Sequence, residues 1–91
     1  MSELKQRITT EMKAAMRAKD KERLSTIRMM LAELKRIEID ERIELDDTRV
    51  LTVLDKMSKQ RRDSISQFEE AARRDLASAE RRELEGIKTF L

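Results

Sequence analysis

The chain contains no proline and one glycine, Gly86, in 91 residues. Because these two residue types interrupt helices most strongly, long stretches of the chain can run as continuous helix. Charged residues make up 44% of the sequence, yet the formal net charge is only +2 and the hydrophobic residues recur at helical spacing. Such spacing is typical of packed helices, whereas scattered hydrophobic residues in a highly charged chain are typical of disorder. The sequence therefore predicts an all-α, single-domain protein with a thin core.

The spacing predicts four helices packed as a bundle, over about residues 3–18, 21–39, 47–72 and 76–91. A residue that commonly caps helices stands before each of them: Ser2, Asp20, Asp46 and Asp75. Leu45 and Val50 are spaced as a hydrophobic staple around the start of the third helix. Gly86 costs about 1 kcal/mol relative to alanine within a helix, and we expect it to permit a close crossing with another helix.

The third predicted helix organises the rest of the chain. At about 100° per residue, one face carries a row of apolar side chains: Val50, Val53, Leu54, Met57, Ile65, Phe68 and Ala72. Arg61 lies near the centre of this apolar face. The opposite face carries Lys56, Lys59 and Arg62, which we call the outer ridge. The helix therefore combines a core face, an arginine placed within it and a cationic outer surface.

An arginine in an apolar face needs an anionic partner, because an unpaired buried charge is strongly destabilising. The candidates are Glu11, Glu80 and Glu83, which lie on the apolar faces of their own helices. Glu80 and Glu83 are one turn apart and would hold the Arg61 guanidinium together. We expect a structural polar cluster that fixes how the fourth helix docks on the third. The alternative is a site at which Arg61 holds a carboxylate or phosphate of a substrate.

The outer ridge is a candidate for contact with an RNA phosphate backbone, and Lys19 and Arg23 are further candidates. The chain has no tyrosine or tryptophan, and both phenylalanines are predicted in the core, so bases would find little to stack on. Contact would therefore follow the shape and backbone of a structured RNA. Charge is also segregated, since residues 13–36 hold eight basic and three acidic side chains and residues 37–47 hold six acidic and one basic. Solvated helix faces, or surfaces complementary to a protein partner, are the alternatives.

The inventory of side chains excludes several classes of chemistry. Without cysteine or histidine, the chain has no thiol nucleophile, no histidine base, no Cys/His zinc site and no disulfide. It also lacks the glycines of a phosphate-binding loop. We expect no catalytic constellation, no metal site and no cofactor. The longest apolar run, residues 29–32, is too short to span a membrane, and we expect a cytoplasmic protein without membrane association.

Three runs of the sequence, residues 12–24, 50–65 and 75–83, resemble the YqeY-like (GatB/YqeY) family of small bacterial proteins. The most specific part is the Lys-x-x-Lys-Gln-Arg-x-Asp-Ser-Ile segment that begins at Lys56, and the resemblance covers essentially the whole chain. The family is related to the C-terminal tail of the B subunit of aspartyl/glutamyl-tRNA amidotransferase. The resemblance thus implies a multihelical domain linked to tRNA-dependent amidation, in which the tail helps to recognise tRNA and other domains carry the chemistry.

The family label of carbon–nitrogen ligase with glutamine as amide donor implies an enzyme, but this chain has neither the glutaminase machinery nor the ATP-dependent kinase domain of that reaction. Family members usually continue with a Leu-Pro-Gln step and a smaller second helical region. That region is absent here, which indicates a fragment or a shortened form.

We therefore expect a non-catalytic accessory module that associates with tRNA or another structured RNA through its basic helix face. The alternative is a protein–protein adaptor without RNA contact. In a truncated chain, an exposed Phe90–Leu91 seam at the end of the last helix would allow a dimer.

Overall fold

The computed structural model describes residues 2–91, and within that range the chain forms four helices and no strand. They are α1 (Glu3–Arg17), α2 (Lys21–Glu41), α3 (Asp47–Glu70) and α4 (Arg74–Lys88). The predicted all-α, four-helix fold is confirmed. The first three helices start at the expected residues, and the other boundaries differ by one to three residues, since α2 runs on to Glu41 and α4 ends at Lys88. No helix in the described part of the chain is long and apolar enough to cross a membrane.

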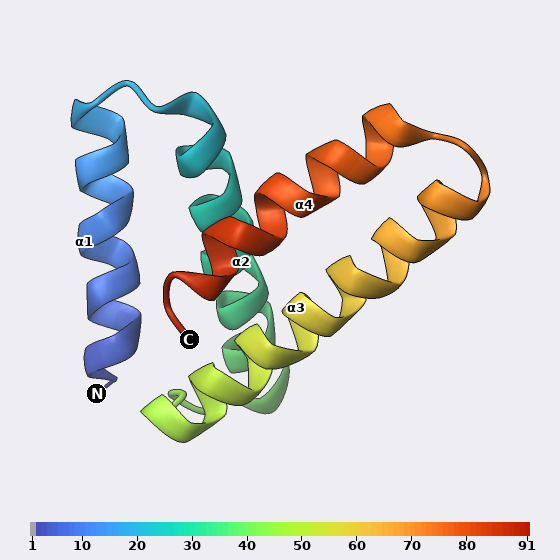
Figure 1. Ribbon diagram of the computed structural model, residues 1–91. Helices are drawn as coiled ribbons and strands as arrows, with labels where there is room; N and C mark the ends of the chain where they lie inside the picture. The colour runs from blue at the N-terminus through green and yellow to red at the C-terminus, as the bar shows by residue number, and fades with distance from the viewer. Residues whose placement is uncertain (1) are drawn as a thin grey trace.

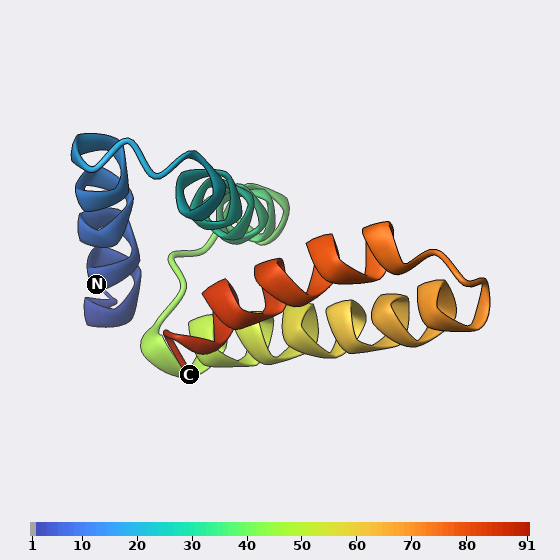
Figure 2. The same ribbon diagram turned by 45° about the horizontal axis from the view of Figure 1, so that its top comes forward.

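The helices form two pairs of chain neighbours (Figure 1). α1 and α2 run in roughly opposite directions, as do α3 and α4, and the contacts within these two pairs are the most extensive between any helices. α4 also crosses α2, while the turn between α3 and α4 projects away from α1 and α2 (Figures 1 and 2). The described chain therefore has an elongated outline, with extents of 43 × 31 × 20 Å.

The starts of the first three helices follow the predicted capping residues. Ser2, Asp20 and Asp46 each accept a hydrogen bond from the backbone N–H three residues further on, at 2.9–3.1 Å. The prediction for α4 is wrong, because Arg73 occupies its cap position and no side chain bonds there. Asp75 lies in the first turn instead, where its charge favours the helix dipole.

Three helices end in a left-handed residue that is not glycine. Lys19, Arg42 and Ala72 have φ of 57°, 55° and 57° at the ends of α1, α2 and α3. In each case the next N–H bonds to the carbonyl five residues back, at 2.8–3.2 Å, as in a Schellman motif. A left-handed conformation costs about 1 kcal/mol or more for residues other than glycine. The N–H of Arg73 takes part in the turn that ends α3, and α4 begins at the next residue, Arg74.

The core lies where the two helix pairs meet and draws on every helix. Its side chains that are at most 1% exposed include Ile8, Ile27, Met30, Leu34, Leu45, Val50, Leu54 and Ile87. Burial of both Leu45 and Val50 is what the predicted staple requires. Phe90 is also buried, at 3% exposure, so the expectation of an exposed Phe90–Leu91 seam is wrong for Phe90, while Leu91 is half exposed. The aromatic ring is taken into the core because the chain turns inward after α4.

Gly86 provides the close crossing that the sequence predicted. A Cβ atom at this position would lie 3.0 Å from the Thr26 Cγ2 atom of α2, well inside ordinary contact distance. Thr26 is 4% exposed, and its hydroxyl donates to the Glu22 carbonyl at 3.2 Å. α4 thus approaches α2 so closely that a methyl group at position 86 would require Thr26 to shift.

Candidate nucleic-acid interface

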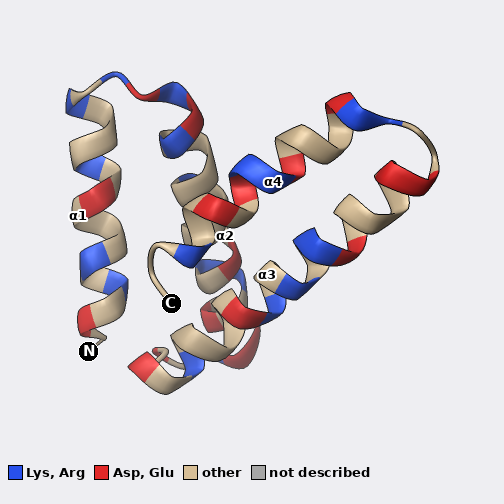
Figure 3. Ribbon diagram, viewed as in Figure 1, with Lys and Arg blue, Asp and Glu red and all other residues tan. Residues whose placement is uncertain are grey.

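The outer ridge lies on the exposed side of α3. Lys56, Lys59 and Arg62 are all exposed, and none forms an ion pair with another described residue. Successive basic bands along the middle of α3 mark this region in Figure 3. The pKa of Glu33 on α2 is lowered, mainly by the hydrogen bond from Arg36. The charge of Lys56 is near enough to α2 to contribute to this lowering. The ridge therefore offers three cations to a ligand, of which Lys59 and Arg62 are the more remote from carboxylates of α2.

Two carboxylates interrupt the outer ridge. Asp55 and Asp63 stand four residues before and after Lys59, so they share its face of the helix, and both are exposed. In Figure 3 the basic bands of α3 are bounded by acidic bands for this reason. Sequence reasoning overlooked these acids, although the four-residue spacing was readable. They weaken the positive potential of the ridge for a polyanion.

Lys19 and Arg23 do not extend the outer ridge. Lys19 is in the turn between α1 and α2, which lies far from the middle of α3 in both views (Figures 1 and 2). The Arg23 guanidinium lies 5.7 Å from the centroid of the Phe90 ring and 3.5 Å from Glu11. The Arg7 guanidinium also lies over that ring, at 5.2 Å. Arg23 therefore helps to hold the end of the chain in place, and only Lys19 remains exposed.

Arg61 lies at the seam of three helices. Its Nε atom is 2.8 Å from Glu83 Oε2 and 3.3 Å from Glu80 Oε2, both on α4, and its Nη2 atom contacts the Met29 sulfur of α2. The side chain is 16% exposed. Burial raises the pKa of Glu80, and the neighbouring Glu83 carboxylate raises it further. The charge of Arg61 lowers this pKa but does not cancel the rise. One cation thus ties α3 to both carboxylates and to α2.

Glu11 does not belong to the Arg61 cluster, contrary to expectation. It pairs with Arg23 across the α1–α2 pair. Hydrogen bonds between α1 and α3 instead lie at the start of α3, where Asp47 accepts from the Ser2 hydroxyl and the Leu4 N–H. Arg61 is fourteen residues, or about 21 Å along the helix, beyond that contact. The sequence pattern showed a polar residue in an apolar face but not which helices would meet.

Residues 5–91 match the family described as Yqey-like protein. The chain belongs to the YqeY-like family. It is 40% identical over 82 residues to the protein named "Altered inheritance of mitochondria protein 41, mitochondrial" of Vanderwaltozyma polyspora and, to the same extent, to its namesake in Lachancea thermotolerans. Each match covers 89% of the chain and 44% of the yeast protein. An uncharacterized protein of Schizosaccharomyces pombe is 32% identical over 77 residues, which is 85% of the chain and 63% of that protein. The YqeY-like chain thus spans less than half of the two mitochondrial relatives.

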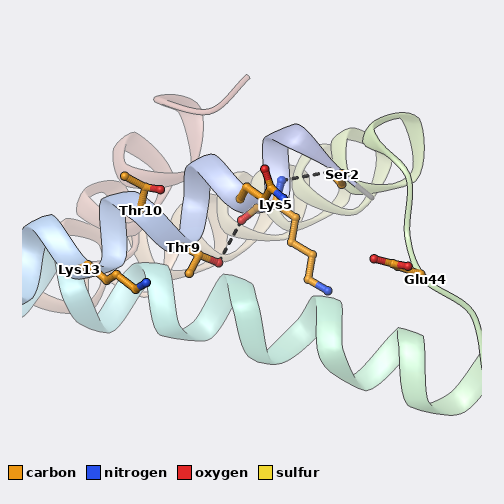
Figure 4. A pocket seen from close by; sticks show the side chains of 7 residues that line it. Ser2, Lys5, Thr9, Thr10, Lys13 and Glu44 are labelled. Carbon is orange, nitrogen blue, oxygen red and sulfur yellow. Dashed lines mark hydrogen bonds between the residues drawn. The ribbon is translucent and has the colours of Figure 1, made fainter.

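The YqeY-like chain also has a surface hollow of about 400 Å³ beside α1 (Figure 4). It is lined by Ser2, Lys5, Gln6, Thr9, Thr10, Lys13 and Glu44. Lys5 is committed to Glu38, with its Nζ atom 2.6 Å from the carboxylate, and this bond is the main cause of the lowered pKa of Glu38. The Thr9 hydroxyl donates to the Lys5 carbonyl at 3.1 Å. The hollow combines ammonium and hydroxyl groups, and among the described residues no cluster of acidic side chains is placed to hold a metal ion.

Proposed function

We propose that this YqeY-like domain is a non-catalytic accessory module that binds the phosphate backbone of tRNA or another structured RNA. The observation that carries the proposal is the separation of the cations on α3. Arg61 is mostly buried and paired with Glu80 and Glu83, while the outer ridge is exposed and free of ion pairs within residues 2–91. Cations displayed on one rigid helix bind phosphates with release of counterions. The relation to the amidotransferase tail favours tRNA as the RNA.

We do not assign carbon–nitrogen ligase activity to this chain alone. Neither histidine nor cysteine is available as a base or nucleophile. The family reaction also requires a glutaminase and an ATP-dependent kinase, which reside in other domains of the amidotransferase. Release of ammonia from glutamine by the pure 91-residue protein would overturn this position.

A titration of labelled total tRNA tests the proposal. For three phosphate contacts we expect affinity to fall about 20- to 40-fold between 50 and 200 mM salt, from the slope per contact. The variant Lys56→Ala/Lys59→Ala/Arg62→Ala should bind more weakly and show a smaller salt dependence than the wild type. The matched variant Asp55→Asn/Asp63→Asn should bind more tightly, because it removes the two acids that interrupt the outer ridge. Absence of binding by the wild type at 50 mM salt would refute the proposal.

A protein partner is the second candidate, and two exposed isoleucines favour it. Ile39, in the last turn of α2, and Ile43, two residues beyond the end of this helix, are 64% and 41% exposed. An adaptor would bury them against its partner. Ile39→Lys/Ile43→Lys should then abolish capture of that partner while the outer-ridge variant retains it, and tRNA binding should show the opposite pattern.

The location of the protein also stays a prediction. The sequence predicts a cytoplasmic protein of the bacterial type, whereas the names of the two yeast relatives contain the word mitochondrial. Immunodetection in fractionated cells of the source organism distinguishes the two compartments.

A further inference from the structure

A second row of cations runs along α2. Lys21, Arg28 and Lys35 are spaced seven residues apart, which is close to two helical turns, so they form one line on the helix surface. We call this line the basic stripe. All three residues are exposed, and none forms an ion pair with another residue of the described chain. The line spans about 21 Å, at about 1.5 Å per residue.

The basic stripe faces away from the α3–α4 pair. On α2, Thr26 packs against Gly86 of α4, and Met29 contacts Arg61 of α3, which together mark the side of α2 that is turned toward that pair. Arg28 follows Thr26 by two residues and is therefore rotated by about 200° around the helix axis. The stripe thus lies on the outer surface of the molecule and on the opposite helix pair from the outer ridge.

α1 adds to the same surface. The bond between Lys5 and Glu38 marks the line along which α1 and α2 meet. The buried side chains of α1 and α2 lie on one side of this line. The helical positions of Thr9 and Lys13 on α1, and those of the basic stripe on α2, lie on the other side. Figure 4 shows the side chains of Thr9 and Lys13 extending from α1 toward α2 at the hollow. Lys13 forms no ion pair with a described residue and is exposed.

Carboxylates do not interrupt the basic stripe as they interrupt the outer ridge. Between its first and last cations α2 carries two acids, Glu22 and Glu33. Glu22 is paired with Arg82 of α4 at 3.2 Å, and Glu33 is paired with Arg36 at 2.7 Å. Both acids stand on the side of α2 that faces the α3–α4 pair. Three evenly spaced cations therefore project into solvent without neighbouring acids on their line.

We propose that the basic stripe, together with Lys13, is the principal phosphate-contacting surface of this domain and that it binds a double-helical region of RNA. This inference rests on the proposed function and moves its main contact from α3 to the α1–α2 pair. A rigid, elongated row of cations beside threonine hydroxyls matches a phosphate and 2′-hydroxyl backbone. Stable binding to an anionic membrane usually adds buried apolar area to the charge attraction, but the exposed Met16 and Ile39 stand at opposite ends of the pair.

The test compares two variants with equal loss of charge in binding to a labelled 20-base-pair RNA duplex and to total tRNA. One is Lys21→Gln/Arg28→Gln/Lys35→Gln, and its matched control is Lys56→Gln/Lys59→Gln/Arg62→Gln. Because glutamine is a good helix former, both should melt like the wild type by circular dichroism. We expect the stripe variant to lose about tenfold or more in affinity at 50 mM salt and to reduce the salt slope by about 2 to 3. The control should lose clearly less.

The outcomes separate this inference from the proposed function. Equal losses in the two variants would show an effect of net charge, and loss in the control variant alone would show that the outer ridge is the contact. Either result overturns the inference and leaves RNA binding in place. Failure of the wild type to bind either RNA overturns both, and binding to phosphatidylserine vesicles in that case would identify a membrane surface instead.

Discussion

Gly86→Ala tests whether the close crossing of α4 and α2 controls stability. Alanine favours a helix over glycine by about 1 kcal/mol, so at an uncrowded site this change would stabilise the protein. Here the new methyl group would meet Thr26 Cγ2 at 3.0 Å. Thr26 cannot yield easily, because its χ1 is restricted, its side chain is buried and its hydroxyl is bonded to Glu22. Overpacking of this kind costs about 1–3 kcal/mol. The steric cost should exceed the gain in helix propensity, with a net loss of about 1 kcal/mol.

Urea denaturation of four proteins measures this balance. They are the wild type, Gly86→Ala, Thr26→Ser and the double variant. Thr26→Ser removes the obstructing methyl group and keeps the hydroxyl, so Gly86→Ala in that background should be neutral or stabilising by up to about 1 kcal/mol. The coupling between the sites should therefore be about 1–2 kcal/mol in a double-mutant cycle. A stabilising effect of Gly86→Ala in the wild-type background would refute the reasoning, because it would show that the crossing accepts a larger side chain.

Two further predictions concern the ion pairs. Arg61→Met should lower the free energy of unfolding at pH 7 by about 2–4 kcal/mol, because it leaves Glu80 partly buried without its cation. Unchanged stability together with loss of a bound anion in a binding assay would instead assign Arg61 to a ligand site. The pKa of Glu38 lies below its ordinary value of 4.5, mainly through the hydrogen bond from Lys5 and then through the Leu45 N–H. Its contribution to stability is therefore present above pH 4.5 and is lost as the pH falls through the lowered pKa. Lys5→Met should shrink this acid-dependent loss in thermal melts recorded between pH 6 and pH 3, and an unchanged pH profile would contradict the assignment.

Local features of the fold were readable from the sequence because they depend on neighbours in the chain. The capping oxygens of Ser2, Asp20 and Asp46 bond to backbone groups three residues away, so their positions alone predicted three helix starts. The helix ends were less readable. Glycine is the usual signal for a left-handed end, and here Arg42 and Ala72 adopt that conformation instead.

Contacts between helix pairs were only partly predictable. Arg61 needed carboxylates wherever it was buried, and Glu80 and Glu83 were the pair spaced to supply them. The partner of Glu11, by contrast, depends on how α1 docks on α2 and on the course of the chain after α4. The same geometry brings Arg23 over the ring of Phe90, and nothing in the sequence predicted that these two residues would be in contact.

The pairing of chain neighbours has a consequence for how this protein folds. Since the most extensive contacts lie within α1–α2 and within α3–α4, only short loops must close before each pair gains its stabilising contacts. Topologies of this kind fold fast. The seam between the pairs contains the shared core and is held by the Gly86–Thr26 crossing, the Asp47 hydrogen bonds and the Arg61 cluster, so docking of the two pairs is the step that completes folding. A ligand that grips one pair alone would leave this seam free to open, whereas one that spans both would slow its opening.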